Sequence, residues 1–485
     1  MSVGKVWLVG AGPGDSGFLT LRGREVLLDA DSVVFDRLVG DGVLAMIPQS
    51  ARAICVGKEG GCHPVPQKEI EELLVREALA GRKVVRLKGG DVFLFGRGGE
   101  EIETLLKHNV PFEVVPGISS AMAAPAAAGI PVTHRGLAAA MHIITAHTRK
   151  GCVADLDYAA LSKIGGTLVF LMGASSVPEI CKTLLSNGMD AARPAAAVEN
   201  GTTAKQRRID STLGELERDC FESQLKSPAV IIVGEVAGLG PRFDWKRYLP
   251  LSGLRVVVAR PRERAGKLSK MLRDRGAEVV ELPTISTLTL DVRLPLFAGC
   301  GWVCFTSVTG VESFFELLRK EAKDVRSLGA AKLAAVGPTT AKALESYGLR
   351  VDYVPEVYDG VHLAEGMLRL AAGSKIILLR AKEVSPDLSD KLKAGGADFS
   401  EVAVYETLYE KPVITPKDVD VAVFTSASTV RGFKAAFPEL KVKFACCIGR
   451  QTADEASKAG FVNVRVAAGA TLEDLISTVE ETTKL

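Results

Sequence analysis

Residues 375–408 of this chain repeat the pattern of residues 255–288, with many substitutions. Each copy begins with a run rich in β-branched and aliphatic residues, continues through a stretch of helical period and ends in a second apolar run. Identical pairs include Arg260 with Arg380, Leu272 with Leu392, and Gly276 with Gly396. A repeat of this length is a supersecondary unit that buries its apolar face against a neighbour. We therefore predict two related α/β lobes in the second half.

The first half shows the same alternation of strand-like and helix-like segments. Short apolar runs such as VWLVG, KVVRL and AVIIVG are separated by stretches of helical period such as IEELLVREAL and EEIETLLKH. This alternation is typical of an α/β fold. Proline, glycine and aromatic residues in GLGPRFDWKRYLPLSG, at 238–253, indicate a boundary between the halves. We predict a first part over 1–245, with lobes of about 1–135 and 136–245, and a linker over 246–253.

Composition excludes several classes of protein. The net charge of the 485 residues is only +2, so no global basic field favours nucleic acid, and an anionic substrate would need local arginine and lysine clusters. The nine cysteines form no CxxC pair, and no histidine cluster has metal-ligand spacing, so we expect reduced thiols and no metal. Without a charged leader or an apolar run of about 18 residues, we expect a cytoplasmic protein with no membrane contact.

The most distinctive segment for function is RLKGGDVFLFGRGGE at 86–100. A strand that ends in such a loop can bring bare backbone amides and several charges against one ligand. The alternative to a ligand site is an ordinary loop, in which glycines are common and charged side chains are solvated. The earlier run VWLVGAGPGD also has a strand followed by glycines, which is the pattern of a dinucleotide site. Against that interpretation, Pro13 removes an amide and Asp15 would repel phosphate.

Several motifs occur in an order that resembles one known family. They are VWLVGAGPGDSGFLTLRG at 6–23, VVFDRLV at 33–39, VGKEGGCHPVPQKEI at 56–70, VVPGISSAMAAPAAAGIPVTHR at 114–135 and VENGT at 198–202. Over residues 3 to about 245 the chain resembles uroporphyrinogen-III C-methyltransferase. The resemblance implies a two-lobed class III (tetrapyrrole) methyltransferase fold, S-adenosyl-L-methionine as cofactor with S-adenosyl-L-homocysteine as product, and a homodimer formed through this half.

The resemblance also implies a set of cofactor-binding residues. They are Pro13, Gly89, Gly90, Asp91, Leu94, Ser119, Ser120, Met172 and Gly201. Glycine would let the backbone touch the adenosine, and a carboxylate suits a ribose or an amino group. The alternative for Met172 is ordinary core packing. The chain departs from the family pattern at Val92, where proline is usual, and at Ser119-Ser120, where Thr-Ala is usual.

The implied reaction is methylation of uroporphyrinogen III at C2 and C7, which gives precorrin-2. By resemblance, Asp36 is the proton acceptor and Lys58 the proton donor; the alternative for Asp36 and Arg37 is an exposed strand-end pair. Eight substrate carboxylates need cationic partners. The candidates in the motif segments are Arg22, Arg37, Arg97, His134 and Arg135. We expect a separate precorrin-2 dehydrogenase or chelatase to act on the product.

The second half resembles uroporphyrinogen-III synthase over residues 254–481, on the repeat together with FTSVTGVESF and FTSASTVRGF. The resemblance implies closure of hydroxymethylbilane with inversion of ring D. It also implies an exchanged segment, with lobe one at about 254–290 plus 411–485 and lobe two at about 291–410. Tyr405, which replaces Ile285 of the other copy, is our candidate proton donor to the departing hydroxyl.

Hydroxyl side chains at the strand ends of the second half are the candidates for binding substrate carboxylates. They are Thr306, Ser307, Thr340, Thr425 and Thr452. Helix N-capping or turn formation is the alternative for these threonines. The alternative for the whole second half is a degenerate, non-catalytic sensor of a small molecule. The sequence therefore predicts a bifunctional enzyme, with this sensor as the competing hypothesis.

Overall fold

The computed structural model describes residues 3–57, 65–146 and 156–484, and it forms two compact units. The first unit comprises Met1–Thr284 with Lys411–Leu485, and the second comprises Ile285–Glu410. Each unit has the mixed strands and helices that the sequence predicts. Within the described residues, every helix is too short or too polar to cross a membrane.

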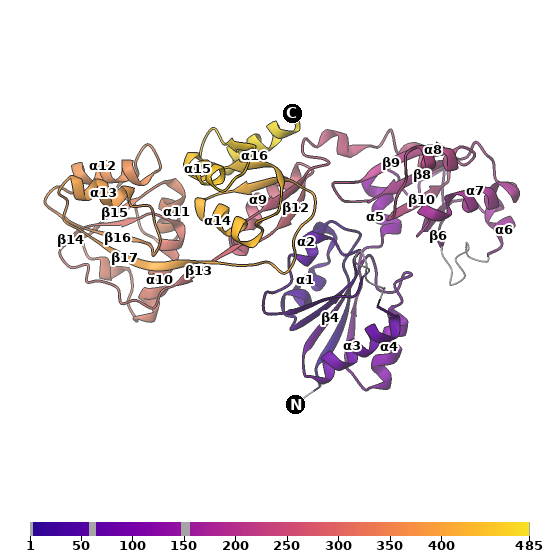
Figure 1. Ribbon diagram of the computed structural model, residues 1–485, viewed down its shortest axis with the longest axis horizontal. Coiled ribbons are helices and arrows are strands. Elements are labelled where there is room, and N and C mark those ends of the chain that lie inside the picture. The colour runs from indigo at the N-terminus through magenta and orange to yellow at the C-terminus, as the bar shows by residue number, and fades with distance from the viewer. Residues whose placement is uncertain (1–2, 58–64, 147–155, 485) are drawn as a thin grey trace. The chain divides into compact units, whose positions relative to one another are not determined.

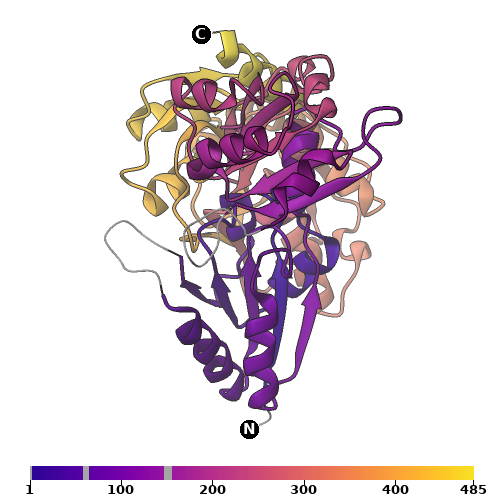
Figure 2. The ribbon, with the colours of Figure 1, turned by 90° about the vertical axis from the view of Figure 1, so that its right-hand side faces the viewer.

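A parallel five-stranded sheet forms the first lobe of the first unit. Its strand order is β3-β2-β4-β1-β5. The strands are β1 (Lys5–Gly10), β2 (Ser32–Phe35), β3 (Arg52–Cys55), β4 (Lys83–Lys88) and β5 (Phe112–Val115). The helices are α1 (Leu21–Leu28), α2 (Asp41–Leu44), α3 (Gln67–Leu79) and α4 (Gly98–Lys107). In Figure 1, α1 and α2 lie on one side of this sheet and α3 and α4 on the other, and Figure 2 shows helices along its strands.

Alternation along the strands explains how both faces are buried. Val6 and Leu8 of β1 pack with residues of α3 and α4, whereas Val9 packs with residues of α1 and α2. Side chains at the end of β4 alternate between the two faces in the same way. Arg86 and Lys88 therefore face the α4 side, although both are charged, and this placement creates the buried network described below.

A mixed five-stranded sheet, in the order β6-β7-β10-β8-β9, forms the second lobe of the first unit. Its strands are β6 (Met141–Thr145), β7 (Thr167–Leu171), β8 (Pro194–Glu199), β9 (Arg207–Thr212) and β10 (Ala229–Val233). Its helices are α5 (Ser120–Ala127), α6 (Tyr158–Lys163), α7 (Val177–Ser186) and α8 (Leu216–Glu222). Although α5 precedes residue 135, it packs into this second core through Ala121 and Ala124. The division between the two cores therefore falls at the start of α5.

Two short 3-10 helices, η3 (Glu235–Leu239) and η4 (Trp245–Tyr248), precede a third sheet in the first unit. This sheet is parallel, in the order β12-β11-β18-β19-β20. Its strands are β11 (Arg255–Val258), β12 (Glu278–Glu281), β18 (Val419–Phe424), β19 (Val442–Cys447) and β20 (Val464–Val466). Its helices are α9 (Arg262–Asp274), α14 (Ala427–Ala436), α15 (Arg450–Lys458) and α16 (Leu472–Glu481).

The second unit holds one sheet, in the order β13-β17-β16-β14-β15. Its strands are β13 (Ile285–Thr289), β14 (Cys300–Phe305), β15 (Lys332–Ala335), β16 (Lys375–Ala381) and β17 (Phe399–Tyr409). Its helices are α10 (Val308–Lys320), α11 (Pro338–Ser346), α12 (Gly360–Leu370) and α13 (Asp387–Ala394). All strand pairs are parallel except β13 with β17. This antiparallel pairing puts β13, which we assigned to the first lobe of the second half, in the second unit.

The internal repeat is visible in the strand orders. The series β12-β11-β18-β19 of the first unit corresponds to β17-β16-β14-β15 of the second. The first series adds β20, and the second adds a parallel bridge from Ala334 to Tyr353. The two copies therefore share one topology, as the sequence repeat predicts, and their differences in side chains become informative.

Candidate functional site

Three loops of the first lobe meet at the carboxyl ends of β1, β4 and β5, and they touch through bare backbone. Gly12 and Gly90 exchange two hydrogen bonds, with N–O distances of 3.1 and 2.7 Å. A Cβ atom on Gly117 would lie 2.2 Å from the Gly90 oxygen and 2.6 Å from Gly10 Cα. Only glycine permits this approach. Gly90 itself has φ of +70° and open space where a Cβ would stand, so this surface is free to receive a ligand closely.

Asp91 fastens two of these loops together. Its Oδ1 accepts hydrogen bonds from the Phe93 and Leu94 amides at 2.8 and 3.0 Å, and its Oδ2 accepts one from Gly117 at 3.1 Å. Partial burial alone would raise the pKa of Asp91, but these backbone donors hold the pKa below its usual value. The carboxylate thus builds the loop, and its contact with a cofactor stays a prediction.

The second lobe brings its strand-end loops to the same place. Leu94 packs against the core that contains α5 and Leu171, the last residue of β7. A Cβ on Gly201, in the loop after β8, would lie 2.4 Å from Ala124 Cβ of α5. The structure therefore brings together most of the predicted cofactor residues, at the strand ends of two sheets.

Met172 and the two serines occupy characteristic positions in these loops. Met172 directly follows β7, has φ of +59° and is half exposed. A left-handed conformation is unusual for a bulky residue, and such residues cluster at functional sites. Ser119 caps α5 by accepting a hydrogen bond from the Ala121 amide at 3.2 Å, and Ser120 is the first residue of the helix. The half-exposed position of Met172 therefore argues against the alternative of core packing.

The loop after β1 continues this chain of contacts. Pro13 is half-buried between Gly12 and Gly14. A Cβ on Gly14 would lie 2.8 Å from Thr203 Cγ2, and the Asp15 amide donates to Thr202 Oγ1 at 3.4 Å. The loops after β1 and β8 therefore touch.

A buried network of charges lies behind the first-lobe loops. Arg86 donates to Glu101 Oε1 at 3.0 Å and to Asp36 Oδ1 at 2.8 Å, and Lys88 Nζ donates to Glu101 Oε1 at 2.9 Å. The side chains of Arg86, Lys88 and Glu101 are at most 4% exposed, whereas Asp36 is 31% exposed. The network therefore presents one carboxylate at the surface, just after β2, where it can accept a proton.

The pKa values of the two cations in this network shift in opposite directions. Burial alone would lower the pKa of Arg86, but Glu101 and Asp36 raise it. Burial and the neighbouring Arg86 cation lower the pKa of Lys88, against the opposing effect of Glu101. Arg86 therefore remains a cation that fixes the Asp36 carboxylate in place.

The predicted substrate cations divide into two groups. Arg37, His134 and Arg135 are exposed, the last two in a turn that His134 closes by bonding Ala138 at 3.0 and 2.9 Å. Arg97 is half exposed, with φ of +60°, and its guanidinium donates to Glu100 at 2.8 and 2.7 Å. Lys58, the predicted proton donor, lies outside the described residues.

Arg22 lies apart from these loops. It bonds Glu113 at 3.0 Å, and the same carboxylate accepts from Lys5 Nζ at 2.8 Å and Trp7 Nε1 at 3.0 Å. The Lys5 and Arg22 hydrogen bonds lower the pKa of Glu113 to about 2. Since Lys5 begins β1, this cluster joins α1 to the strands away from their carboxyl ends. The structure does not bring Arg22 to the predicted substrate site.

In the second unit, Tyr405 and Ser307 are brought together. Tyr405 is buried in β17, and its hydroxyl lies 3.0 Å from Ser307 Oγ. The register of β16 and β17 shifts between Arg380 and Ala381, where Ala381 pairs with Tyr405, and such an irregularity re-aims a side chain. Ser307 also caps α10 by accepting from the Gly310 amide at 2.9 Å. The pair can relay a proton to a group bound beside it.

The predicted threonines take several positions. Thr306 follows β14 and Thr425 follows β18, and both are half-buried. Thr340 and Thr452 are buried in the first turns of α11 and α15. The capping alternative is wrong for these last two, because Gly337 and Gly449 occupy the N-cap positions. Substrate contact by all four threonines stays a prediction.

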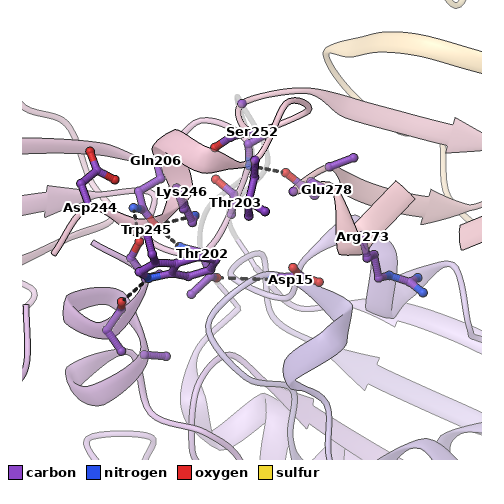
Figure 3. A pocket seen from close by; sticks show the side chains of 18 of the residues that line it. Asp15, Thr202, Thr203, Gln206, Asp244, Trp245, Lys246, Ser252, Arg273 and Glu278 are labelled. Atoms are coloured by element: carbon purple, nitrogen blue, oxygen red, sulfur yellow. Dashed lines mark hydrogen bonds between the residues drawn. The ribbon is translucent and has the colours of Figure 1, made fainter. Parts of the chain in front are cut away.

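A cavity of about 920 Å³ in the first unit was missed by our sequence analysis (Figure 3). It is lined by the loop 202–206, by the segment around Trp245 and by Glu278 at the start of β12. Trp245 Nε1 donates to the Ala126 oxygen at 3.1 Å, and Lys246 Nζ donates to Gln206 Oε1 at 3.1 Å. Burial lowers the pKa of Lys246. The sequence motifs that contain Asp15 and Thr202 do not predict this cavity, because its other residues come from distant segments.

Comparison with known proteins covers almost the whole chain. Residues 5–217 match the family Tetrapyrrole (Corrin/Porphyrin) Methylases, and residues 266–477 match Uroporphyrinogen-III synthase HemD. The chain is 43% identical to the porphyrin biosynthesis protein HemD of Ruminiclostridium josui, over 99% of this chain and 98% of that protein. This chain belongs to that HemD family. The predicted families and the predicted α/β fold class are therefore confirmed.

Other relatives match a smaller share of this HemD family member. The uroporphyrinogen-III C-methyltransferase of Bacillus subtilis is 39% identical over 72% of this chain and 73% of that protein. A solved structure of uroporphyrin-III C-methyl transferase from Thermus thermophilus, complexed with S-adenyl homocysteine, is 41% identical. The match covers 49% of this chain and 100% of that chain, with a TM-score of 0.43. Nothing in these comparisons supports the alternative of a degenerate second half.

Glu101 is the residue of this HemD family member that sequence reasoning missed in the first-lobe site. The signal was present in the sequence. Arg86 and Lys88 fall on the buried face of an alternating strand, and buried cations require a buried carboxylate. The following helix supplies that carboxylate through Glu101, whose other oxygen, Oε2, has no hydrogen-bond partner among the described residues.

Proposed function

We propose that this chain is a bifunctional enzyme of tetrapyrrole synthesis. Its second half closes hydroxymethylbilane to uroporphyrinogen III with inversion of ring D. Its first half then methylates uroporphyrinogen III at C2 and C7 with S-adenosyl-L-methionine, which gives precorrin-2. The observation that carries the proposal is the meeting of five strand-end loops near a partly exposed carboxylate, Asp36, in a chain that matches a HemD protein along its length.

The loops fit the proposed cofactor. The sulfonium is a cation and needs no phosphate cradle, which agrees with a loop that carries Pro13 and Asp15. Gly90 leaves open space for close backbone approach, and half-exposed Met172 offers a polarizable apolar surface for an adenine ring. Pro13, Gly89, Gly90, Asp91, Leu94, Ser119, Ser120, Met172 and Gly201 would hold the cofactor.

Asp36 has the surroundings of a proton acceptor. The bound cofactor supplies an electrophilic methyl group, whose transfer to a pyrrole carbon leaves S-adenosyl-L-homocysteine and one proton to be removed. Arg86 holds the Asp36 carboxylate in one orientation, while its exposed fraction leaves it accessible. A positioned carboxylate of this kind can take the proton. Lys58 is proposed as the donor on the family resemblance alone.

In the second half, Tyr405 is the proposed proton donor to the departing hydroxyl of hydroxymethylbilane. The Ser307 hydroxyl at 3.0 Å can accept from Tyr405 or replenish its proton. The C–O bond breaks as water leaves, and the new C–C bond closes the ring, so no oxidant or reductant is required. The hydroxyls of Thr306, Thr340, Thr425 and Thr452 are proposed contacts for the substrate carboxylates, and Arg37, Arg97, His134 and Arg135 are the corresponding cations of the first half.

Domain boundaries, assembly and location are part of this proposal. We propose a methyltransferase over residues 1–245 and a synthase over 254–485, a homodimer formed through the methyltransferase, a cytoplasmic location, and a separate dehydrogenase or chelatase that consumes the product. Gel filtration with light scattering would test the dimer. A monomer at micromolar concentration would contradict it.

Separate assays test the two activities. Purified full-length chain should bind S-adenosyl-L-homocysteine in a calorimeter and should add two methyl groups to uroporphyrinogen III. It should also convert hydroxymethylbilane to the type III isomer without added cofactor. Absence of cofactor binding would contradict the first activity, and formation of only the uninverted isomer would contradict the second.

A further inference from the structure

An ion pair between β11 and β12 lies where the synthase half contacts the methyltransferase half within the first unit. Arg255 and Glu278 are register partners at the starts of these strands, and Arg255 Nη2 lies 2.7 Å from Glu278 Oε1. Their side chains are only 13% and 7% exposed. A pair at the edge of a sheet is ordinarily solvated, so the burial of this pair needs a cause.

The cause is contact with one loop and with the start of α2 in the methyltransferase half. Glu278 Oε2 accepts a hydrogen bond from the Ala204 amide at 2.7 Å, at the edge of the cavity in Figure 3. Arg255 Nη1 donates to Asp41 Oδ2 at 3.0 Å and to the Lys417 oxygen at 2.8 Å. A buried carboxylate that accepts from a backbone amide makes a strong, charge-assisted bond.

Both contacted segments lie close in sequence to residues of the proposed methyltransferase site. Ala204 lies three positions after Gly201, in the loop that touches Asp15 through Thr202. Asp41 lies five positions after Asp36, and a Cβ on the intervening Gly40 would lie 1.9 Å from the Gly14 oxygen. A second ion pair, between Lys205 and Asp418, reinforces the first of these contacts.

The internal repeat supplies a comparison within the same chain. Lys375 and Asp398 occupy the positions of Arg255 and Glu278 in the other copy, with Lys375 at the start of β16 and Asp398 just before the parallel strand β17. Both residues are exposed. The synthase topology therefore does not require a buried pair at these positions, and what differs in the first copy is the contact with the methyltransferase loops.

We propose that the Arg255–Glu278 pair of the synthase half positions the methyltransferase loops that hold the cofactor and Asp36. This inference rests on the proposed function, and it assigns Arg255 and Glu278 as positioning residues, since neither is proposed to touch substrate or cofactor. Loss of the pair should weaken cofactor binding and leave ring closure unaffected.

The test compares Glu278→Ala with Asp398→Ala, the repeat-matched control, in the full-length chain. Glu278→Ala should weaken calorimetric binding of S-adenosyl-L-homocysteine about tenfold, as expected for a lost hydrogen bond to a buried charge. Hydrogen exchange of the amides of residues 200–206, without cofactor, should also accelerate. Asp398→Ala should change neither quantity, and both variants should keep the rate of ring closure.

A conservative variant and a second site keep the test decisive. Glu278→Gln retains an oxygen acceptor for the Ala204 amide and should restore part of the affinity. If Glu278→Ala fails to fold, Asp41→Ala breaks the same link from the methyltransferase side and should raise the KM for the methyl donor more than it lowers kcat. Wild-type affinity and unchanged exchange in the folded variants would overturn the inference.

The inference and the proposed function fail in different ways. If the wild-type chain did not bind the cofactor product at all, the methyltransferase assignment would be wrong, and so would a positioning role for the pair. If the wild-type chain bound it and the variants bound it equally well, only the positioning role would be wrong.

Discussion

The two candidate sites of this chain are formed by different kinds of chemical group. The methyltransferase site is formed mainly by backbone, where glycines of three loops touch and one partly exposed carboxylate, Asp36, ends a buried ionic network. The synthase candidate in the second unit is a pair of side-chain hydroxyls, Tyr405 and Ser307, on a repeated scaffold. The first should therefore be sensitive to a side-chain atom added where two glycine loops touch, and the second to the loss of a single oxygen.

The largest effect is expected from Asp36→Asn. The amide keeps the size of the side chain but cannot take a proton, so the methylation rate should fall about a thousandfold. Ring closure by the same protein should continue at the wild-type rate. Initial rates of both reactions on one preparation provide the measurement, and equal losses in both would contradict the separation of the two sites.

Tyr405→Phe should have the reverse pattern. Removal of one hydroxyl should slow formation of uroporphyrinogen III about a hundredfold and leave methylation unchanged. Tyr409→Phe, on the same strand but half exposed, is the matched control. Isomer analysis of the products would reveal the loss. A variant as fast as the wild type would remove Tyr405 from the mechanism.

Gly117→Ala tests the backbone construction of the first site. The new methyl group would fall 2.2 Å from the Gly90 oxygen, so the loops must separate. Affinity for S-adenosyl-L-homocysteine should fall about tenfold or more, and unfolding should become easier by about 1–3 kcal/mol. Gly99→Ala is the control, because a Cβ there meets no atom within 4 Å. Equal calorimetric affinities of the two variants would contradict the proposed contact.

The smallest effect concerns Glu113, which holds Arg22 away from the loops. Its pKa of about 2 in the folded chain lies below the ordinary value of 4.5, so its contribution to stability is complete above pH 4.5 and is lost as the pH falls toward 2. Glu113→Gln should lower stability by about 1 kcal/mol or less at pH 7. The difference from wild type in the first thermal transition should shrink between pH 4.5 and 2. A larger difference at pH 3 than at pH 7 would contradict this.

Much of the fold follows from local pattern. The apolar runs predicted as strands became β1, β4, β10, β11 and β16, because β-branched and aliphatic content reflects burial in a sheet. The repeat predicted two lobes of one topology. The assignment of β13 was less accessible, since its sequence fits either lobe and only pairing with β17 decides its place.

Site residues that belong to one loop could be predicted from the sequence. Contacts between residues of distant segments could not. Gly89, Gly90 and Asp91 stand together in the sequence, and the structure places Gly90 against the loop after β1 and Asp91 against the loop after β5. By contrast, Arg22 falls within a motif segment, yet its charge is used by Glu113, a partner 91 residues away. The contact between Glu278 and Ala204 spans 74 residues and crosses the boundary between the two halves. No local pattern encodes such pairings.

One measurement tests the central claim most directly, which is that the two sites act in succession on one tetrapyrrole. Full-length chain is supplied with hydroxymethylbilane, with and without S-adenosyl-L-methionine, and the products are examined by mass spectrometry and isomer analysis. The account predicts the type III macrocycle without the methyl donor and the same macrocycle with two added methyl groups in its presence. An unmethylated product under both conditions, or a methylated type I isomer alone, would contradict it.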